Sequence, residues 1–559
     1  MPELINHTLG RLLEEKAREY PHNDAVVYPL KQHIRWSYRE FNHICDEVGK
    51  GLMAMGVQKG DHVAMWATNY PQWIVSMFAC AKIGAVLVTV NTNYKKFEAE
   101  YLLKQSDTTT LIMIGGYRDS DYVEHIYDLC PELYDCVPGQ LQSACLPRLK
   151  NVIFIPQSEG ERHDGMYNWE DLHALAQTVT DKQLKARKES CDKDDVVMMQ
   201  YTSGTTGFPK GVMLTHYNIV NNGRAIGECM EFSHNDRLLI HVPLFHCFGC
   251  VLGVMASVNY AATMVFLEYF HPVRAMEAIQ IERCTAVHGV PTMFIAMLEH
   301  DRFQEFDFSS LRTGIMAGSP CPVEVMKRVM NEMHMPEITI SYGQTESSPV
   351  ITMTEPDDPV ELRVATVGTR QPHMEVKIVD METGEDVPYG TQGEIVTRGY
   401  QVMKGYYNMP EATAAAIDKE GWLHTGDIGT MDEEGYFRIT GRMKDMIIRG
   451  GENIYPREIE EFIYTHPSVQ DVQVIGVPDK RYGEEVAAYV ILKDGAQVLT
   501  ESDMISYVRE GLSRFKAPRY VRYVDTFPMT ASGKIQKFKM REQAIEDLGL
   551  QEAAQIVTA

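Results

Sequence analysis

The residues best suited to chemistry form one loop that is rich in hydroxyls and glycines and carries a single lysine. It occupies residues 201–212 and reads Tyr-Thr-Ser-Gly-Thr-Thr-Gly-Phe-Pro-Lys-Gly-Val. Glycine lets a backbone approach an anion closely, successive N–H groups form an anion-binding concavity, and the hydroxyls and Lys210 add donors and a cation. The spacing is not that of a Walker loop, which ends in Gly-Lys-Ser or Gly-Lys-Thr. We therefore predict a triphosphate site on another scaffold.

Two further segments carry residues that suit a nucleotide. In residues 341–347, Tyr342 could stack on a purine, Thr345 could donate to a phosphate, and Glu346 could ligate Mg²⁺. A strand end with a solvated glutamate is an equally good reading of that segment taken alone. In residues 421–427, Asp427 could accept hydrogen bonds from both ribose hydroxyls, although an aspartate that bonds its own turn is the simpler reading.

Two segments nearer the C-terminus combine charges with glycine. Residues 441–445 and 450–454 place paired charges beside glycines, which suits a hinge, and an ordinary charged linker is the alternative. Residues 528–535 hold Lys534 in a Ser-Gly turn, where a lone lysine is usually only solvated. The meaning of these two segments depends on the other three.

The elements that must position these segments alternate between strand and helix patterns over the first two thirds of the chain. Such alternation predicts an α/β fold of parallel sheets covered by helices. From about Thr366 short strands with glycine turns indicate a β-rich subdomain, which extends to about 441. Beyond it lies a compact mixed α/β pattern. We place the domain boundary near Lys444.

Composition narrows the function classes. The chain has 559 residues, too many for one ordinary core, and a formal net charge of −24, which argues against broad nucleic-acid binding. Eleven scattered cysteines do not form a disulfide framework, and Cys247 and Cys250 are read as small core residues. The N-terminus lacks a signal-type apolar region, and the apolar windows 73–90 and 251–270 are read as buried helix-then-strand units. We expect a cytoplasmic protein without a transmembrane segment.

Taken together, the five segments resemble the adenylate-forming superfamily of acyl-CoA synthetases, luciferases and carrier-loading adenylation domains, in the family's order and over nearly the whole chain. The most similar members are the fatty and medium-chain acyl-CoA synthetases. The resemblance implies a large N-terminal domain, residues 1–443, with two parallel-type helix-flanked sheets and the β-rich subdomain. It also implies a small mobile α+β C-terminal domain, residues 444–559.

The resemblance further implies a reaction in two steps. An acid is activated with ATP to acyl-AMP and pyrophosphate, and the acyl group then passes to coenzyme A with release of AMP. Thr345 would contact the α-phosphate, Glu346 would hold Mg²⁺, and Lys534 would reach the carboxylate and α-phosphate. The remaining ATP-binding positions would be Thr202, Ser203, Gly204, Thr205, Thr206, Lys210, Gly318, Ser319, Pro320, Tyr342, Gly343, Gln344, Asp427 and Arg442.

In this family the C-terminal domain swings about its hinge between the two steps. Lys444 occupies the matching hinge position, and the swing would bring Arg449, Gly450 and Gly451 to the active site for coenzyme A. His246, in the family's loop at the mouth of the acyl pocket, would border the acyl-adenylate and gate the thiol channel. Arg514, Lys516 and Arg519 are candidates for the coenzyme A phosphates, with a solvated surface as the equal alternative.

The substrate is less well defined by the sequence. Acetyl-specific relatives have tryptophan where this chain has Gly343, so a longer acid is expected to fit. An apolar tube would be lined by Val242, Phe248, Gly249, Leu252, Gly289, Val290, Ala317 and Gly318. Medium-chain, long-chain, branched, aryl and dicarboxylic acids all stay open. The alternative functions are an acyl-AMP ligase that loads a carrier-protein thiol, a luciferase-like oxidase and a non-catalytic nucleotide sensor; a homodimer is also considered.

Overall fold

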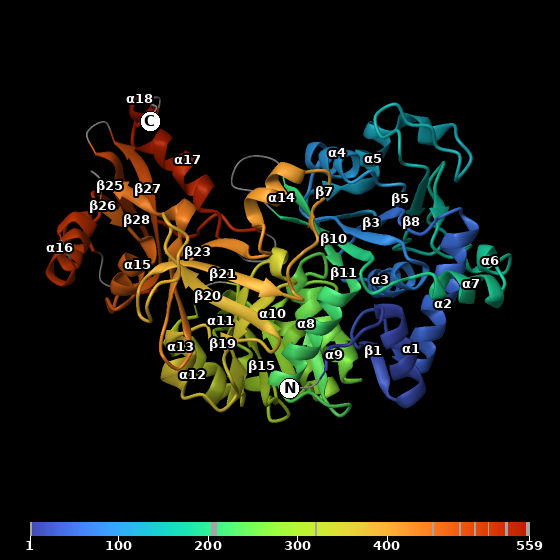
Figure 1. Ribbon diagram of the computed structural model, residues 1–559, viewed down its shortest axis with the longest axis horizontal. Helices are drawn as coiled ribbons and strands as arrows, with labels where there is room; N and C mark the ends of the chain where they lie inside the picture. The colour runs from blue at the N-terminus through green and yellow to red at the C-terminus, as the bar shows by residue number, and fades with distance from the viewer. Residues whose placement is uncertain are drawn as a thin grey trace. The chain divides into compact units, whose positions relative to one another are not determined.

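The computed structural model describes residues 3–202, 209–318, 321–449, 452–479, 482–496, 499–512, 514–530 and 535–554. The chain forms two compact units. Unit 1 comprises residues 1–376 and 397–423, and unit 2 comprises residues 377–396 and 424–559. The edges of the units fall within a β-rich region, and the domain boundary and the hinge at Lys444 stay predictions. Figure 1 shows the elements of both units.

Unit 1 contains a seven-stranded sheet in which every neighbouring pair except β1–β2 is parallel. Its order is β16-β15-β14-β12-β13-β1-β2. The strands are β1 (Asp24–Tyr28), β2 (Ile34–Ser37), β12 (Arg237–Ile240), β13 (Thr263–Phe266), β14 (Ala286–Gly289), β15 (Thr313–Met316) and β16 (Glu337–Thr339). The carboxyl ends of β12, β14 and β15 lie at one edge of the sheet, which is where ligands bind in folds of this type.

A second sheet of unit 1 has eight strands in the order β22-β11-β10-β4-β3-β5-β8-β9. Only β11 runs antiparallel to its neighbours. The strands are β3 (His62–Trp66), β4 (Val86–Thr89), β5 (Thr110–Met113), β8 (Asn151–Phe154), β9 (Tyr167–Asn168), β10 (Val196–Thr202), β11 (Lys210–Thr215) and β22 (Gly405–Tyr406). The prediction of two largely parallel, helix-flanked sheets is confirmed (Figure 1).

Helices cover both sheets. One core joins them through α3 (Pro71–Ile83), α8 (His216–Cys229) and the π-helix η2 (Phe248–Met255). A second core lies on the other face of the seven-stranded sheet, under α10 (Pro272–Glu282), α11 (Pro291–Leu298) and α12 (Val323–Glu332). The windows 73–90 and 251–270 are thus buried helix-then-strand units, as expected.

Local signals explain why several of these helices begin and end where they do. The first helix, α1 (Leu9–Glu19), begins after Thr8, whose hydroxyl accepts a hydrogen bond from the Arg11 amide. Helix α3 has proline at its first turn and ends at Gly84, which adopts a left-handed conformation with φ of 72°. No helix among the described residues is long and apolar enough to cross a bilayer.

Three smaller sheets complete the site-bearing parts of the chain. In unit 1, β17 (Ser341–Gly343), β18 (Val350–Met353) and β19 (Thr369–Arg370) form an antiparallel sheet. A four-stranded sheet follows, which contains β20 (Met374–Val379), β21 (Gly393–Gly399), β23 (Leu423–Met431) and β24 (Phe437–Arg442). The limits between the two units fall within β20, β21 and β23.

The rest of unit 2 is a mixed α+β fold, as the sequence predicts. Its sheet comprises β25 (Ile447–Arg449), β26 (Glu452–Ile454), β27 (Val469–Asp479), β28 (Gly483–Leu492) and β29 (Tyr520–Tyr523). The helices α15 (Pro456–Tyr464) and α16 (Glu501–Gly511) cover one core, and α17 (Lys537–Asp547) covers another.

Candidate active site

Glu346 lies in a short 3₁₀ turn, Thr345–Ser347, between β17 and β18. The Tyr406 hydroxyl donates a hydrogen bond of 2.8 Å to its Oε1, and the Met403 amide donates one of 2.9 Å to its backbone carbonyl. Tyr406 ends β22, where it pairs with Val212 of β11. The chain after residue 400 therefore brings a tyrosine to the carboxylate that the sequence assigns to a metal.

Lys210 approaches the same tyrosine. Its Nζ lies 4.3 Å from the centre of the Tyr406 ring. Lys210 is the first residue of β11 and pairs with Thr202, the last residue of β10, so the two strands form the base of the hydroxyl-rich loop. The structure thus joins the ends of that loop to Glu346 through Tyr406, a residue that the sequence reasoning missed. The Gly405-Tyr406 strand gave no motif signal of its own.

Thr345 lies beside the loop that carries His246. Cys247 Sγ is 3.9 Å from Thr345 Oγ1 and 3.6 Å from His246 Nδ1. The Phe248 amide donates to that Nδ1 over 3.2 Å, so this nitrogen serves as an acceptor. Two predicted catalytic residues from distant parts of the sequence are therefore neighbours across a buried thiol.

The His246 loop is held by backbone contacts. The buried Asn69 side chain donates to the Val242 carbonyl over 3.0 Å and accepts from the Leu244 amide over 2.9 Å. A Cβ at Gly249 would lie 2.4 Å from the Pro243 carbonyl oxygen, so only glycine fits there. These contacts fix where the loop leaves β12 and enters η2.

The wall next to this loop includes a histidine that the sequence reasoning also missed. His288 is fully buried, accepts from the Ile315 amide over 3.1 Å at Nδ1, and lies 3.2 Å from the Leu252 carbonyl through Nε2. Its ring stacks on Phe248 at 6.0 Å. Burial lowers the pKa of His288 to about 4, which keeps it neutral. The period-two alternation of β14 was the available signal, because it puts His288 and Gly289 on opposite faces.

A side chain at Gly289 would point away from His288, towards Phe294 and His241. A Cβ there would lie 3.2 Å from Phe294 Cε2 and 3.5 Å from His241 Nε2. His241 is buried, and neither of its ring nitrogens has a hydrogen-bond partner among the described residues. Three residues expected to line an apolar tube therefore have different neighbours. Gly289 lies next to His241, whereas Phe248 and Leu252 lie next to His288.

Gly343 has a backbone reason for being glycine. A Cβ at this position would lie 1.8 Å from the Pro349 carbonyl oxygen, across the irregular pairing of β17 with β18. Tyr342 and Gln344 flank it, both partly exposed. Gly318 follows β15 with φ of 90°, a conformation that favours glycine. The Pro349 backbone therefore requires glycine at position 343, whatever the length of the acid substrate.

Unit 2 holds the residues predicted for the ribose. Asp427 is 2% exposed, and its Oδ1 lies 2.6 Å from Arg442 Nε, its partner across β23 and β24. The Glu394 carboxylate bonds the His424 ring over 2.7 Å and accepts from the Gly426 amide over 2.9 Å. Glu394 therefore braces the turn that presents Asp427.

The cations predicted for coenzyme A have carboxylate neighbours. Arg449 Nε lies 2.9 Å from Glu485 Oε2, and an Nη1 donates to the Phe515 carbonyl over 2.6 Å. Lys516 pairs with Glu458 and Arg519 with Asp479, each within 2.8 Å. Lys444 lies in the 3₁₀ turn Met443–Asp445.

Several predicted site residues lie outside the described part of the chain. The structure therefore neither supports nor opposes their assignment. They are Ser203, Gly204, Thr205, Thr206, Ser319, Pro320, Gly450, Gly451 and Lys534.

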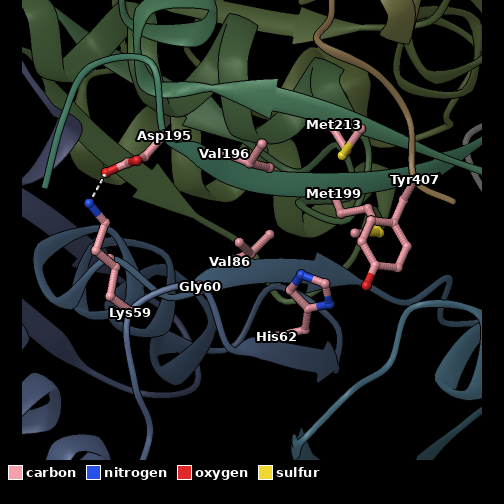
Figure 2. A pocket seen from close by; sticks show the side chains of 10 residues that line it. Lys59, Gly60, His62, Val86, Asp195, Val196, Met199, Met213 and Tyr407 are labelled. Carbon is pink, nitrogen blue, oxygen red and sulfur yellow. Dashed lines mark ion pairs between the residues drawn. The ribbon is translucent and has the colours of Figure 1, made fainter. Parts of the chain in front are cut away.

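A cavity of about 210 Å³ lies elsewhere in unit 1, where β3, β4 and β10 begin (Figure 2). Lys59 and Asp195 form an ion pair of 2.7 Å at one end, and the His62 and Tyr407 rings meet edge to face at 5.0 Å at the other. Val86 and Val196 line the middle of the cavity, and Met199 and Met213 lie on the side of Tyr407. It is separate from the site above, because none of the predicted site residues lines it.

Comparison with known proteins agrees with this geometry. The family model of AMP-binding enzymes matches residues 13–407, and the model of their C-terminal domain matches residues 458–534. YngI of Bacillus subtilis (strain 168), named as an acyl-CoA synthetase, is 56% identical over 98% of this chain and 99% of its own.

Two further likenesses extend over most of the chain. The mitochondrial medium-chain acyl-CoA ligase ACSF2 of Macaca fascicularis is 40% identical over 98% of this chain and 88% of its own. The ATP-bound structure of MatB from Rhodopseudomonas palustris is 27% identical, with a TM-score of 0.80 over 97% of this chain and 99% of its own.

The chain belongs to the family of AMP-binding enzymes. Within that family it is an AMP-forming acid–thiol ligase of the acyl-CoA synthetase class, which uses an acid, ATP and coenzyme A.

Proposed function

We propose that this ligase activates a medium-chain carboxylic acid. The observation that supports the proposal most is the 40% identity, over 98% of the chain, to a ligase named for medium-chain acids. The apolar residues Val242, Phe248 and Leu252, which are buried beside the His246 loop, suit an alkyl chain. Each buried methylene adds about 0.8 kcal/mol, so such a wall favours longer acids up to the point where the space ends.

In the adenylation step we assign two hydrogen-bond donors of unit 1, one of them cationic, to the phosphates. Lys210 would steady the leaving pyrophosphate, and Thr345 would donate to the α-phosphate. An acid and ATP repel each other as anions, so neutralising and positioning groups supply much of the catalysis. His246 would border the acyl group at the mouth of its pocket. Tyr342 and Gly318 would flank the adenine.

The Mg²⁺ that such ligases use fits the residues present. The described residues contain no group of three or more histidines, cysteines or carboxylates able to cage a metal. Mg²⁺ in nucleotide sites is commonly held by one or two carboxylates together with substrate phosphates, and Glu346 supplies a hydrogen-bonded carboxylate. We propose that Glu346 holds the cation, whose charge would offset that of the phosphates.

In unit 2 we assign Asp427 and Arg442 to the ribose, and Lys534 to the carboxylate and α-phosphate during adenylation. A hinge at Lys444, between a domain of residues 1–443 and one of residues 444–559, would then exchange Lys534 for the segment of Arg449, Gly450 and Gly451 before thioester formation. The family's order of motifs supports these roles. A cytoplasmic location and a homodimer stay predictions from the sequence, and the macaque relative is named as mitochondrial.

A series of straight-chain acids from acetate to palmitate tests the substrate. The release of AMP and the formation of the thioester are measured for each acid at saturating ATP and coenzyme A. We expect kcat/KM to be highest for acids of medium length. A maximum at acetate or at palmitate would contradict the medium-chain assignment, and acyl-AMP formed without any thioester would favour a carrier-protein ligase.

A further inference from the structure

Tyr406 touches two functional side chains of opposite charge. Its hydroxyl donates to Glu346 Oε1 over 2.8 Å, while its ring centre lies 4.3 Å from Lys210 Nζ. The tyrosine is 6% exposed, and its amide donates to Thr413 Oγ1 over 2.9 Å, so the ring is held from both ends.

We propose that Tyr406 is a positioning residue that holds the Glu346 carboxylate and the Lys210 ammonium in place and apart from each other. The inference rests on the proposed role of Glu346 as the metal ligand. The hydrogen bond fixes the orientation of the carboxylate, and carboxylate oxygens are the ligands that a hard cation prefers. The ring face attracts the ammonium through its quadrupole.

The separation matters because the two groups attract each other. Glu346 and Lys210 form no ion pair within 4.0 Å of one another, although both contact the same tyrosine. Lysine has a long flexible stem, and a direct Lys210–Glu346 pair would neutralise the carboxylate before a cation arrived. The aromatic ring offers the ammonium an alternative partner, so the carboxylate keeps its charge for the metal.

The test compares nucleotide binding with and without a metal. The full-length chain is titrated calorimetrically with α,β-methylene-ATP, which cannot form an acyl-adenylate, in Mn²⁺ and in EDTA. The dissociation constant in EDTA divided by that in Mn²⁺ measures the metal's contribution to nucleotide binding. We expect Tyr406→Phe, which keeps the ring, to lower this ratio about tenfold, as loss of a hydrogen bond to a charged group implies.

Three further variants make the test specific. Tyr407→Phe is the matched control, because the neighbouring tyrosine donates to the Asp107 carboxylate over 2.9 Å instead, and its ratio should equal that of the wild type. Tyr406→Leu should lower the ratio more than Tyr406→Phe does, since Lys210 is then released onto Glu346. Adding Lys210→Met to Tyr406→Leu should restore the ratio to the Tyr406→Phe value.

Three results would overturn the inference. The first is a Tyr406→Phe ratio equal to that of the wild type, and the second is an equal fall for Tyr407→Phe. A wild-type ratio of one would remove the metal role of Glu346 and the inference with it. The proposed ligase activity would stand in that case, because the acid series measures it independently. Unfolding of each variant in urea shows whether a loss of stability, which affects both dissociation constants alike, accompanies the change.

Discussion

At the scale of single residues, the environment of each imidazole decides what that histidine can do. His246 accepts a backbone hydrogen bond and lies in a loop beside Thr345, whereas His288 is hydrogen-bonded to the neighbouring strand β15 and to the helix η2. His241 is buried without a partner for either ring nitrogen among the described residues. Burial, and to a lesser extent the nearby His288, lower the pKa of His241 to about 3.

His241→Leu should stabilise unit 1, most strongly in mild acid. A buried polar group without a partner costs about 1–3 kcal/mol, which leucine avoids. Between the ordinary pKa of 6.5 and the folded-state pKa of about 3, His241 binds a proton in the unfolded chain but not in the folded chain. The free energy of unfolding of the wild type is therefore undiminished above pH 6.5. It decreases as the pH falls through this window, by roughly 2 kcal/mol at pH 5.

Denaturant unfolding at pH 7 and pH 5 measures this effect. The variant should lose less stability than the wild type between the two values. His22→Leu serves as the control, because that histidine is exposed in the folded chain and its removal should leave the pH dependence unchanged. An identical loss in His241→Leu and in the wild type would refute the prediction.

Lys534→Ala should separate the two half-reactions. If Lys534 neutralises charge on the acid and the α-phosphate, acyl-AMP formation should fall by about 10²–10³-fold, as removal of one oxyanion donor does. Thioester formation from supplied acyl-AMP should stay near the wild-type rate. Single-turnover assays of each step provide the measurement, with exposed Lys539→Ala as the control. Equal losses in both steps would argue against the assigned role.

At the scale of elements, the π-helix η2 and the loop before it shape the wall beside the active site. A π-helix is wider than an α-helix and is often found at functional sites. Side chains bond its carbonyls: Ser257 Oγ donates to Gly253 over 2.8 Å, and Asn259 donates to Met255 over 2.8 Å. Glycines permit the tight entry into the helix.

Gly249→Ala should disturb this entry. The new methyl group would meet the Pro243 carbonyl at 2.4 Å, so the loop must move, at a cost of about 1–3 kcal/mol. We expect kcat/KM to fall about tenfold, since the loop carries His246. Gly253→Ala, one turn further on, is the control, because its Cβ would lie 3.3 Å from the mobile end of Ile240. Equal activity of both variants would show that the entry is not constrained as described.

At the scale of the whole molecule, the residues that we assign to the reaction come from distant parts of the sequence. Lys210 and Glu346 belong to unit 1 and Asp427 belongs to unit 2, and Lys534 follows Lys210 by more than three hundred residues in the sequence. An enzyme that runs two reactions at one site must exchange its groups between them, and a hinge is the usual means.

Lys444→Pro should slow the second reaction more than the first. Proline fixes φ near −65°, which restricts a backbone rotation at the hinge. Thioester formation should fall by about tenfold relative to adenylation, equivalent to about 1.4 kcal/mol on that barrier. Lys444→Ala removes the same side chain but leaves the backbone free, so it should act as the wild type does. Wild-type rates for both steps in Lys444→Pro would exclude a hinge at this position.

The sequence by itself determined the class of the fold and supplied the candidate residues of the site. Alternating strand and helix patterns predicted the two sheets, because each element must bury an apolar face whose period is local. The resemblance of five segments, in their order, to the adenylate-forming superfamily implied the class of ligase. Glu346, Asp427 and Thr345 were assigned in this way and stay predictions.

Only the tertiary structure decided which residues support those groups. Tyr406, Glu394 and His288 act on site residues that are far from them in sequence, and no local pattern reports a contact across such a distance. Gly343 shows the same limit, since its reason lies in the Pro349 carbonyl opposite it. Residue types and their local spacing indicate which chemistry is possible. The positions of the reactive side chains depend on packing between distant segments, and this packing exists only in the folded chain.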